Sequence, residues 1–313
     1  AIIFTGCGSA LYAAEIGAYA MESFAKIPCR AISAGELKYF DAAIDEQTVI
    51  IAVSQSGETA DTLGCLTQAK KMGAKTIGIV NVPGSSISRK VDSGIYIRAG
   101  IEKSVASTKA FTNQVIAMIL MGLLIGEKRG MSKDLYRSII DDLSNLPRVI
   151  EKLTSIKPLG VNELSEFKSM ITIGRGILYP AAKEVSLKIK EVTYIHSEAY
   201  SASELKHGPL ALISERCPTI VLSANDGLEK KLLSNMREIT SRGGRIFFIG
   251  PESTDKELLR ISEKFMLYPN VKTKLIGAIC AIICGQIVAL HIAKKLSRPI
   301  DRPRNLAKSV TVE

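Results

Sequence analysis

"VIIAVSQSGETADTL", residues 49–63, is the stretch of sequence that decides the fold. It opens with a short apolar run of strand length, continues through a cluster of hydroxyl side chains with one glycine, and then takes on a helical pattern. A glycine and a second apolar run complete the pattern by residue 80, and residues 217–250 repeat the same order. We therefore predict an α/β fold with two tandem units, each a mostly parallel sheet flanked by helices in the doubly wound, flavodoxin-like manner.

The rest of the chain follows the same alternation. In the first half the pattern predicts strands at 1–5, 48–53, 75–80 and 93–97 and helices at 10–24, 59–72 and 108–126. We assign the first unit to residues 1–130, a helical connector to 131–158, the second unit to 159–296 and a C-terminal tail to 297–313. The chain enters a strand directly, without Met or a cleavage signal, so we expect no signal peptide and read the sequence as a piece of a longer chain.

Composition favours a globular protein that binds a small anionic metabolite. The formal charge of +10 is scattered, aromatic residues make up 5% and Trp is absent, so the sequence predicts no nucleic-acid surface. The apolar run at 275–290 is short for a membrane span and contains Gln286, which favours a buried core helix. The six Cys include no CxxC pair and no His/Cys/Asp cluster stands out, so we expect reduced thiols, no metal and a cytoplasmic location.

The hydroxyl cluster at residues 54–59 is a candidate anion site. Parallel strands end where the ligand crevice of such a sheet lies, and the first N–H groups of the following helix attract an anion. The absence of a Lys favours a phosphate monoester over a nucleoside triphosphate, and Glu58 must turn away from any phosphate. Composition alone leaves helix capping and phosphate binding evenly balanced. The second copy, SANDGL, keeps the turn and drops these hydroxyls, which favours phosphate binding.

Two further loops enter helices. The turn Gly6-Cys7-Gly8-Ser9 lacks the third glycine of a dinucleotide fingerprint, so the sequence predicts neither NAD nor FAD, and we expect no cofactor. "SVASTKAFT", residues 104–112, supplies a similar loop in which Ser107 is a further candidate donor.

Titratable residues cluster in the second half. Glu184, Lys188 and Glu191 fall at i, i+4 and i+7, on one face of a helix, and this spacing alone favours a surface ion-pair ladder. His207 lies in a turn set by Gly-Pro; histidine can shuttle protons near neutral pH, although a lone loop His is more often incidental. The tail "DRPRNLAKSVTVE" is unusually dense in polar residues for a frayed terminus.

Six motifs carry a resemblance to a known family: "SQSGETADTL", "NVPGSSISR", "VASTKAFT", "KIKEVTYIHSEAY", "ELKHGPLALI" and "PRNLAKSVTVE". They span almost the whole chain, which resembles the isomerase half of the glutamine–fructose-6-phosphate aminotransferase family, with its two tandem SIS (sugar isomerase) domains. The resemblance implies conversion of fructose 6-phosphate plus ammonia to glucosamine 6-phosphate. It also implies a homodimer, and a glutaminase domain upstream that releases the ammonia and is not contained in these 313 residues.

The same resemblance implies residue roles. It places the sugar phosphate and sugar on Ser9, Ser54, Gln55, Ser56, Thr59, Val105 and Ser107. His207 matches the histidine that opens the fructose ring from the neighbouring subunit, and Glu191 matches the base that moves a proton between C1 and C2, with Lys188 close by. Lys308 matches the lysine that engages the open-chain C2 carbonyl through an imine.

The sequence departs from the family pattern at three places. Ala10 replaces a hydroxyl in the first glycine turn, Ser203 replaces a glycine before Glu-Leu-Lys-His, and "GIEKSVAST" stands for "GPEIGVAST". Two alternatives remain: a stand-alone phosphosugar isomerase or deaminase, and a non-catalytic phosphosugar-sensing SIS protein. The presence of Glu191, His207 and Lys308 together argues against the sensor, which needs only the phosphate loop.

Overall fold

The chain forms two compact units, each described here by itself. The computed structural model describes residues 1–312. The first unit comprises residues 1–136 and takes in the last stretch, 305–312, while the second comprises residues 137–304. The boundary falls inside the long helix α6 (Lys133–Ser155), which occupies the region expected to be a helical connector.

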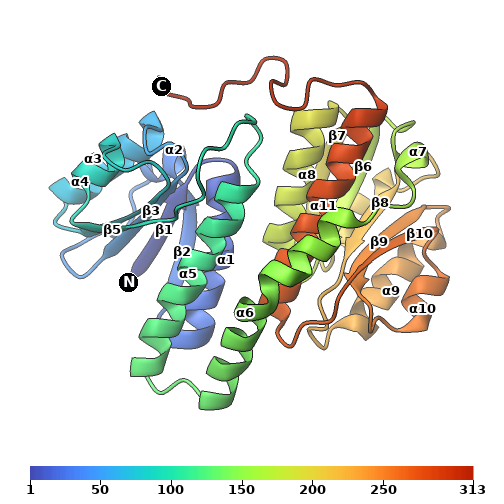
Figure 1. Ribbon diagram of the computed structural model, residues 1–313, viewed down its shortest axis with the longest axis horizontal. Helices are drawn as coiled ribbons and strands as arrows, with labels where there is room; N and C mark the ends of the chain where they lie inside the picture. The colour runs from blue at the N-terminus through green and yellow to red at the C-terminus, as the bar shows by residue number, and fades with distance from the viewer. Residues whose placement is uncertain (313) are drawn as a thin grey trace. The chain divides into compact units, whose positions relative to one another are not determined.

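The first unit is built on a five-stranded parallel sheet. Its strands are β1 (Ile2–Gly6), β2 (Cys29–Ser33), β3 (Val49–Ser54), β4 (Lys75–Val80) and β5 (Ser93–Tyr96). They lie in the order β2-β1-β3-β4-β5, and every pair is parallel (Figure 1). This is the flavodoxin-like order, so the predicted fold class is confirmed for this unit.

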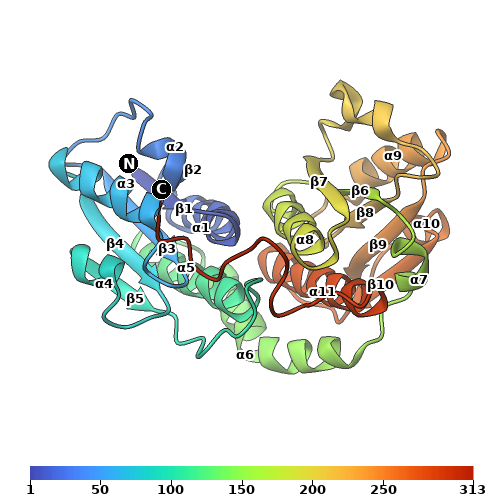
Figure 2. The same cartoon turned by 90° about the horizontal axis from the view of Figure 1, so that it is seen from above.

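Helices cover both faces of this sheet, as Figure 2 shows. On one face lie α1 (Ser9–Ala25) and α5 (Lys109–Lys128); on the other lie α2 (Ala34–Leu37), α3 (Ala60–Lys71) and α4 (Ser86–Lys90). Strand β3 serves both layers, because successive side chains point to opposite faces: Ile50 and Ala52 join the core under α3. Helices α1 and α5 pack closely, since a Cβ added to Gly17 would lie 2.3 Å from the Met118 sulfur.

The second unit repeats this plan. Its strands are β6 (Ser169–Gly174), β7 (His196–Ser201), β8 (Thr219–Leu222), β9 (Ile246–Pro251) and β10 (Lys264–Tyr268), in the order β10-β9-β8-β6-β7 with all pairs parallel. Counted from β6, this is the strand order of the first unit, which confirms the repeat read from the sequence. The helices are α7 (Val161–Leu164), α8 (Leu178–Thr193), α9 (Glu229–Thr240), α10 (Lys256–Arg260) and α11 (Lys274–Lys295).

In this unit α8 and α11 lie side by side on one face of the sheet, and α9 and α10 lie on the other (Figures 1 and 2). Helices α5 and α11 are each long and apolar enough to cross a membrane by length and composition alone. The most apolar window of α11 is 83% buried inside the protein. The prediction that residues 275–290 form a buried core helix is therefore confirmed.

Candidate functional site

The predicted anion site lies where β1 and β3 end, at the point where the strand order reverses. In parallel sheets of this type that point opens a crevice for ligands. The strands are close there, because a Cβ added to Gly6 would lie 2.9 Å from the Val53 carbonyl oxygen. Gly8 has a φ of +55°, a left-handed conformation that glycine tolerates, and Ser9 then begins α1.

Hydroxyl groups fold the loop that follows β3. The buried Ser54 Oγ accepts a hydrogen bond from the Gly57 N–H at 3.0 Å and lies 3.2 Å from the Thr59 hydroxyl. The Ser56 hydroxyl accepts the Glu58 N–H at 3.2 Å. Part of the hydroxyl cluster therefore shapes the turn, so capping and anion binding are combined in one loop.

Three backbone N–H groups of this loop are available to bind an anion. Within residues 1–312, the N–H groups of Gln55, Ser56 and Thr59 meet no hydrogen-bond acceptor. Thr59 is also the residue that precedes the first turn of α3, where the helix dipole places a partial positive charge. Free N–H groups at a helix N-terminus commonly bind phosphate.

Glu58 turns away from this loop, as phosphate binding requires. Its carboxylate accepts the Ser86 N–H at 2.8 Å, at the start of α4. Hydrogen bonds from Ser86 lower the pKa of Glu58, so the group stays ionised and bound to the neighbouring loop. Gly57 has a φ of +68°, and a Cβ there would lie 2.1 Å from the Ser85 hydroxyl, so only glycine fits between the two loops.

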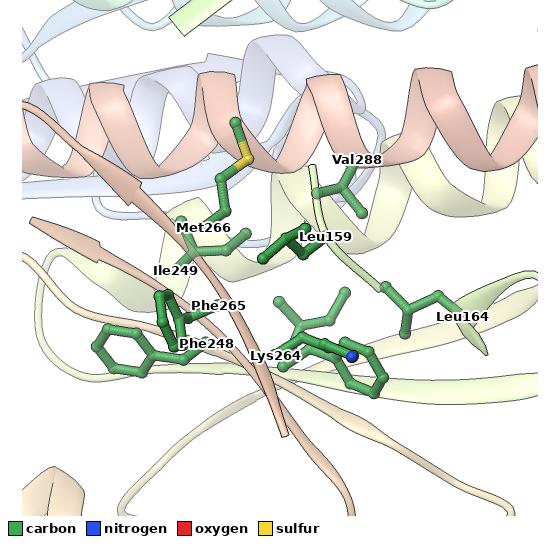
Figure 3. A pocket seen from close by; sticks show the side chains of 10 residues that line it. Leu159, Leu164, Phe248, Ile249, Lys264, Phe265, Met266 and Val288 are labelled. Carbon is green, nitrogen blue, oxygen red and sulfur yellow. The ribbon is translucent and has the colours of Figure 1, made fainter. Parts of the chain in front are cut away.

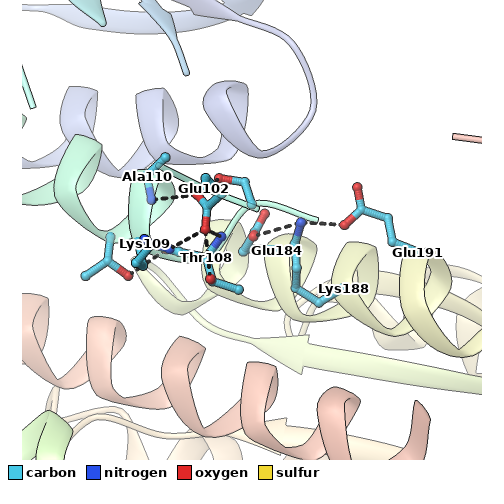
Figure 4. Close-up of polar contacts among 9 residues, drawn as sticks. Glu102, Thr108, Lys109, Ala110, Glu184, Lys188 and Glu191 are labelled. Carbon is cyan, nitrogen blue, oxygen red and sulfur yellow. Dashed lines mark hydrogen bonds and ion pairs between the residues drawn. The ribbon is translucent and has the colours of Figure 1, made fainter. Parts of the chain in front are cut away.

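A buried carboxylate that sequence reasoning missed organises the loop before α5. Glu102 accepts hydrogen bonds from the N–H groups of Thr108, Lys109 and Ala110, at 3.2, 3.1 and 2.9 Å (Figure 4). Ser107 also donates its hydroxyl to Glu102, at 3.3 Å. Because its one hydroxyl proton is used here, Ser107 would meet a sugar as an acceptor or through its backbone.

The tail contacts both loops of the first unit. The Lys308 ammonium donates to the Ser104 carbonyl at 2.5 Å, and the Ser309 hydroxyl donates to the Ser56 hydroxyl at 3.2 Å. The Val310 carbonyl accepts the N–H of the first residue of α3 at 3.2 Å. The structure thus brings Lys308 to the loop that contains Val105 and Ser107, and its neighbour Ser309 to the phosphate loop.

In the second unit, α8 carries a buried ion-pair cluster, drawn in Figure 4. Lys188 lies between two carboxylates: it pairs with Glu184 at 3.5 Å and donates a short hydrogen bond to Glu191. The side chains of Glu184, Lys188 and Glu191 are 0%, 3% and 19% exposed. The expected surface ladder is therefore wrong, because spacing fixes the helix face but not whether that face is covered.

Burial and charge act on Lys188 in opposite directions. Burial alone would lower the pKa of Lys188, but the two carboxylates beside it reverse the effect, and the net pKa lies above its ordinary value. Lys188 is therefore a permanent cation. It holds Glu191, the more exposed of the two carboxylates, in place.

His207 lies apart from this cluster. It ends the short 3-10 turn η1 (Leu205–His207), and it is exposed. Its backbone N–H donates to the Glu204 carbonyl at 2.9 Å. Among residues 137–304, which make up the second unit, it forms no hydrogen bond or ion pair with Glu191.

A cavity in the second unit is not the site. It has a free volume of about 20 Å³ and lies between β9, β10 and α11 (Figure 3). Apart from Lys264 its lining is apolar, with residues that include Leu164, Phe247, Ile249 and Val288. It is too small and too apolar for a sugar phosphate. Among the described residues, no group of three or more His, Cys, Asp or Glu side chains could hold a metal ion.

Known proteins resemble this chain in sequence. The family model of the SIS domain matches residues 1–123 and 163–290. Over 311 residues the chain is 40% identical to a glutamine–fructose-6-phosphate aminotransferase [isomerizing] of Thermus thermophilus, covering 98% of this chain. The chain spans about half the length of that relative, 51%.

Solved structures share the fold over nearly the whole chain. The C-terminal domain of glucosamine-fructose-6-phosphate aminotransferase from Francisella tularensis is 33% identical, with a TM-score of 0.88 over 96% of this chain and 86% of that one. Glucosamine-6-phosphate deaminase from Thermotoga maritima is 22% identical, with a TM-score of 0.80 over 99% of this chain and 90% of that one. At that identity the deaminase shares the fold alone.

Proposed function

We propose that this chain isomerises fructose 6-phosphate. The chain belongs to the SIS-domain family and, within it, to the C-terminal domains of glucosamine-fructose-6-phosphate aminotransferases. With ammonia it forms glucosamine 6-phosphate, and in the full-length protein the ammonia comes from glutamine through a glutaminase domain. The observation that carries the proposal is that the tail reaches two loops of the first unit: Ser309 contacts Ser56 of the phosphate-type loop, and Lys308 contacts Ser104 of the loop before α5.

The phosphate of the substrate binds the loop after β3 and the turn at Ser9. Its oxygens accept hydrogen bonds from the backbone N–H groups of Gln55, Ser56 and Thr59 and from the Ser56 and Thr59 hydroxyls, and Ser54 keeps the loop folded. Support comes from the unused donors of this loop and from the outward turn of Glu58. The sugar then extends along the loop of Val105 and Ser107 toward Lys308.

Lys308 provides the nucleophile. Its amine attacks the open-chain C2 ketone and forms an imine with loss of water; ammonia then displaces the lysine from C2. The contact with the Ser104 carbonyl supports this role, because it orients the amine.

Glu191 transfers the proton from C1 to C2, which converts the ketose derivative to the aldose amine. The buried cation Lys188 supports this assignment, because it holds the carboxylate in one orientation. His207 opens the sugar ring. We propose that it serves the neighbouring subunit of a homodimer, which is consistent with its exposure and with the absence of a hydrogen bond to Glu191 among residues 137–304. The chain requires no cofactor and acts in the cytoplasm.

The test is turnover of fructose 6-phosphate by the purified chain. We expect glucose 6-phosphate without ammonia, glucosamine 6-phosphate with ammonium salts, and loss of both activities in Glu191→Gln. Glu198→Gln, which alters a half-exposed glutamate of β7, is the matched control and should retain activity. Binding of fructose 6-phosphate without any turnover would favour a phosphosugar sensor. Release of ammonia from glucosamine 6-phosphate, without the reverse synthesis, would favour a deaminase.

A further inference from the structure

We propose that Glu102 is a positioning residue for Lys308: its carboxylate fixes the loop 103–107, and the Ser104 carbonyl of that loop fixes the lysine amine. The inference rests on the proposed function only in that Lys308 forms an imine with the sugar. Glu102 itself does not touch Lys308, so its effect is transmitted through the backbone of the loop.

The two carboxylate oxygens of Glu102 collect five hydrogen bonds. Oε1 accepts the Thr108 N–H at 3.2 Å, the Thr108 hydroxyl at 3.1 Å and the Lys109 N–H at 3.1 Å. Oε2 accepts the Ala110 N–H at 2.9 Å and the Ser107 hydroxyl at 3.3 Å. Since Glu102 is only 8% exposed, water cannot readily replace these donors.

These contacts close the intervening chain into a tight loop. A residue that precedes α5 by seven positions caps it, so residues 103–107 must turn back within that span. A second bond, from the Lys109 ammonium to the Ile101 carbonyl at 2.7 Å, closes the same loop on its outer side. Ser104, whose carbonyl accepts the hydrogen bond from Lys308, lies within this closed loop.

The lysine depends on this loop. A lysine side chain has four rotatable bonds and loses rotamer entropy when it is fixed. The 2.5 Å contact with the Ser104 carbonyl selects one position for its Nζ. If the loop opens, the amine loses its contact with the Ser104 carbonyl, and imine formation slows because attack needs one orientation.

The charge of Glu102 is part of the device. Burial would raise the pKa of Glu102, but the N–H groups at the start of α5 outweigh burial and hold it below its ordinary value. An ionised carboxylate accepts on both oxygens. A glutamine of the same shape must turn an NH₂ group toward donors, and therefore cannot accept at one of the two positions.

The experiment compares the wild-type chain with Glu102→Gln and with Glu127→Gln, an exposed glutamate near the other end of α5. Each protein is mixed with fructose 6-phosphate and borohydride, which adds hydride to the C2 imine and leaves a stable secondary amine on Lys308. We expect Glu102→Gln to form this adduct at least about tenfold more slowly, with kcat reduced and KM changed little. Glu127→Gln should match the wild type.

Cleavage by trypsin between Lys308 and Ser309 gives a readout that needs no activity. It should be at least about tenfold faster in Glu102→Gln, because Lys308 loses its contact with the Ser104 carbonyl. Thr108→Val, which removes one of the five donors, should shift both measurements in the same direction by less, and it guards against misfolding of the first variant.

The outcomes separate the two proposals. A wild-type chain that forms no adduct contradicts the proposed role of Lys308, and the cleavage rates then decide the positioning role alone. Equal adduct formation and equal cleavage in wild type and Glu102→Gln overturn the inference while leaving the proposed function intact.

Discussion

Replacing Lys188 by methionine, which keeps the length of the side chain and removes its charge, should destabilise the second unit by roughly 3–4 kcal/mol at pH 7. At 3.5 Å and an effective dielectric constant of about 20, the attraction to Glu184 is roughly 5 kcal/mol. The loss is limited, because the fully buried Glu184 can take up a proton in the folded variant. Protonating a carboxyl whose unfolded pKa is about 4.3 costs roughly 3.7 kcal/mol at pH 7.

The pH dependence follows from the same proton. The folded variant binds one proton more than its unfolded chain above about pH 4.3, so its stability falls as the pH rises and recovers by about 1.4 kcal/mol for each unit of acidification. The wild type lacks this dependence at this site. Hydrogen exchange of α8 amides in the full chain is the assay, and the loss corresponds to roughly 500-fold faster exchange at pH 7.

Two further variants control this measurement. Lys188→Met combined with Glu184→Gln should recover most of the protection, because no fully buried charge remains on this face of α8. Lys190→Met alters an exposed lysine of the same helix and should change little. If Lys188→Met exchanges less than about threefold faster than wild type, or no faster than Lys190→Met, the reasoning from a buried ion pair is refuted.

Three other predictions follow from the first unit and from the segment that leads into the tail. The double variant Ser56→Ala/Thr59→Ala should raise the Kd for fructose 6-phosphate by at least about tenfold, with a small shift of the urea midpoint; an unchanged Kd in calorimetry would reduce the loop to a plain turn. The Tyr194 hydroxyl accepts the Arg304 backbone N–H at 2.8 Å, and the Arg304 guanidinium stacks on the Tyr194 ring. Trypsin should therefore cut the Tyr194→Leu variant after Arg304 about tenfold faster than the wild type, and Tyr194→Phe at a rate between the two. Equal cleavage rates would contradict the anchoring of Arg304 by Tyr194. The pKa of Glu102 is lower in the folded than in the unfolded chain, so this carboxylate stabilises the fold above the unfolded pKa of about 4.3 and ceases to do so as the pH falls through the folded pKa. The urea midpoint of the wild type should therefore drop more steeply below about pH 5 than that of Glu102→Gln. Parallel curves for the two proteins would contradict this contribution of Glu102.

The fold was readable from the sequence because the repeat reports it twice. The predicted strands and helices of the first half lie within two residues of β1, β3, β4, β5, α1, α3 and α5. The pattern missed β2, α2 and α4, which are short and have no sustained apolar period. These elements owe their structure to the neighbouring strands and loops on which they pack, and not to their own sequence.

The site was readable only where chemistry is local. The loop at 54–59 can be recognised from its composition, since hydroxyl residues and a glycine directly follow a strand. The role of Glu102 needs the loop to close on α5, a distance in space that spacing along the chain does not give. The buried state of Lys188 likewise depends on what covers the helix, so the periodicity that placed it on one face was compatible with the wrong environment.

The contacts of the tail have a consequence for the order in which the protein folds. The Ser309–Ser56 and Lys308–Ser104 bonds join positions 253 and 204 residues apart, far beyond the span of any βα unit. Closing loops of that length is entropically costly, and non-local contacts form late. During refolding, circular dichroism should recover before Lys308 regains its protection from trypsin. For that interval the chain is a folded protein whose proposed nucleophile has not yet docked.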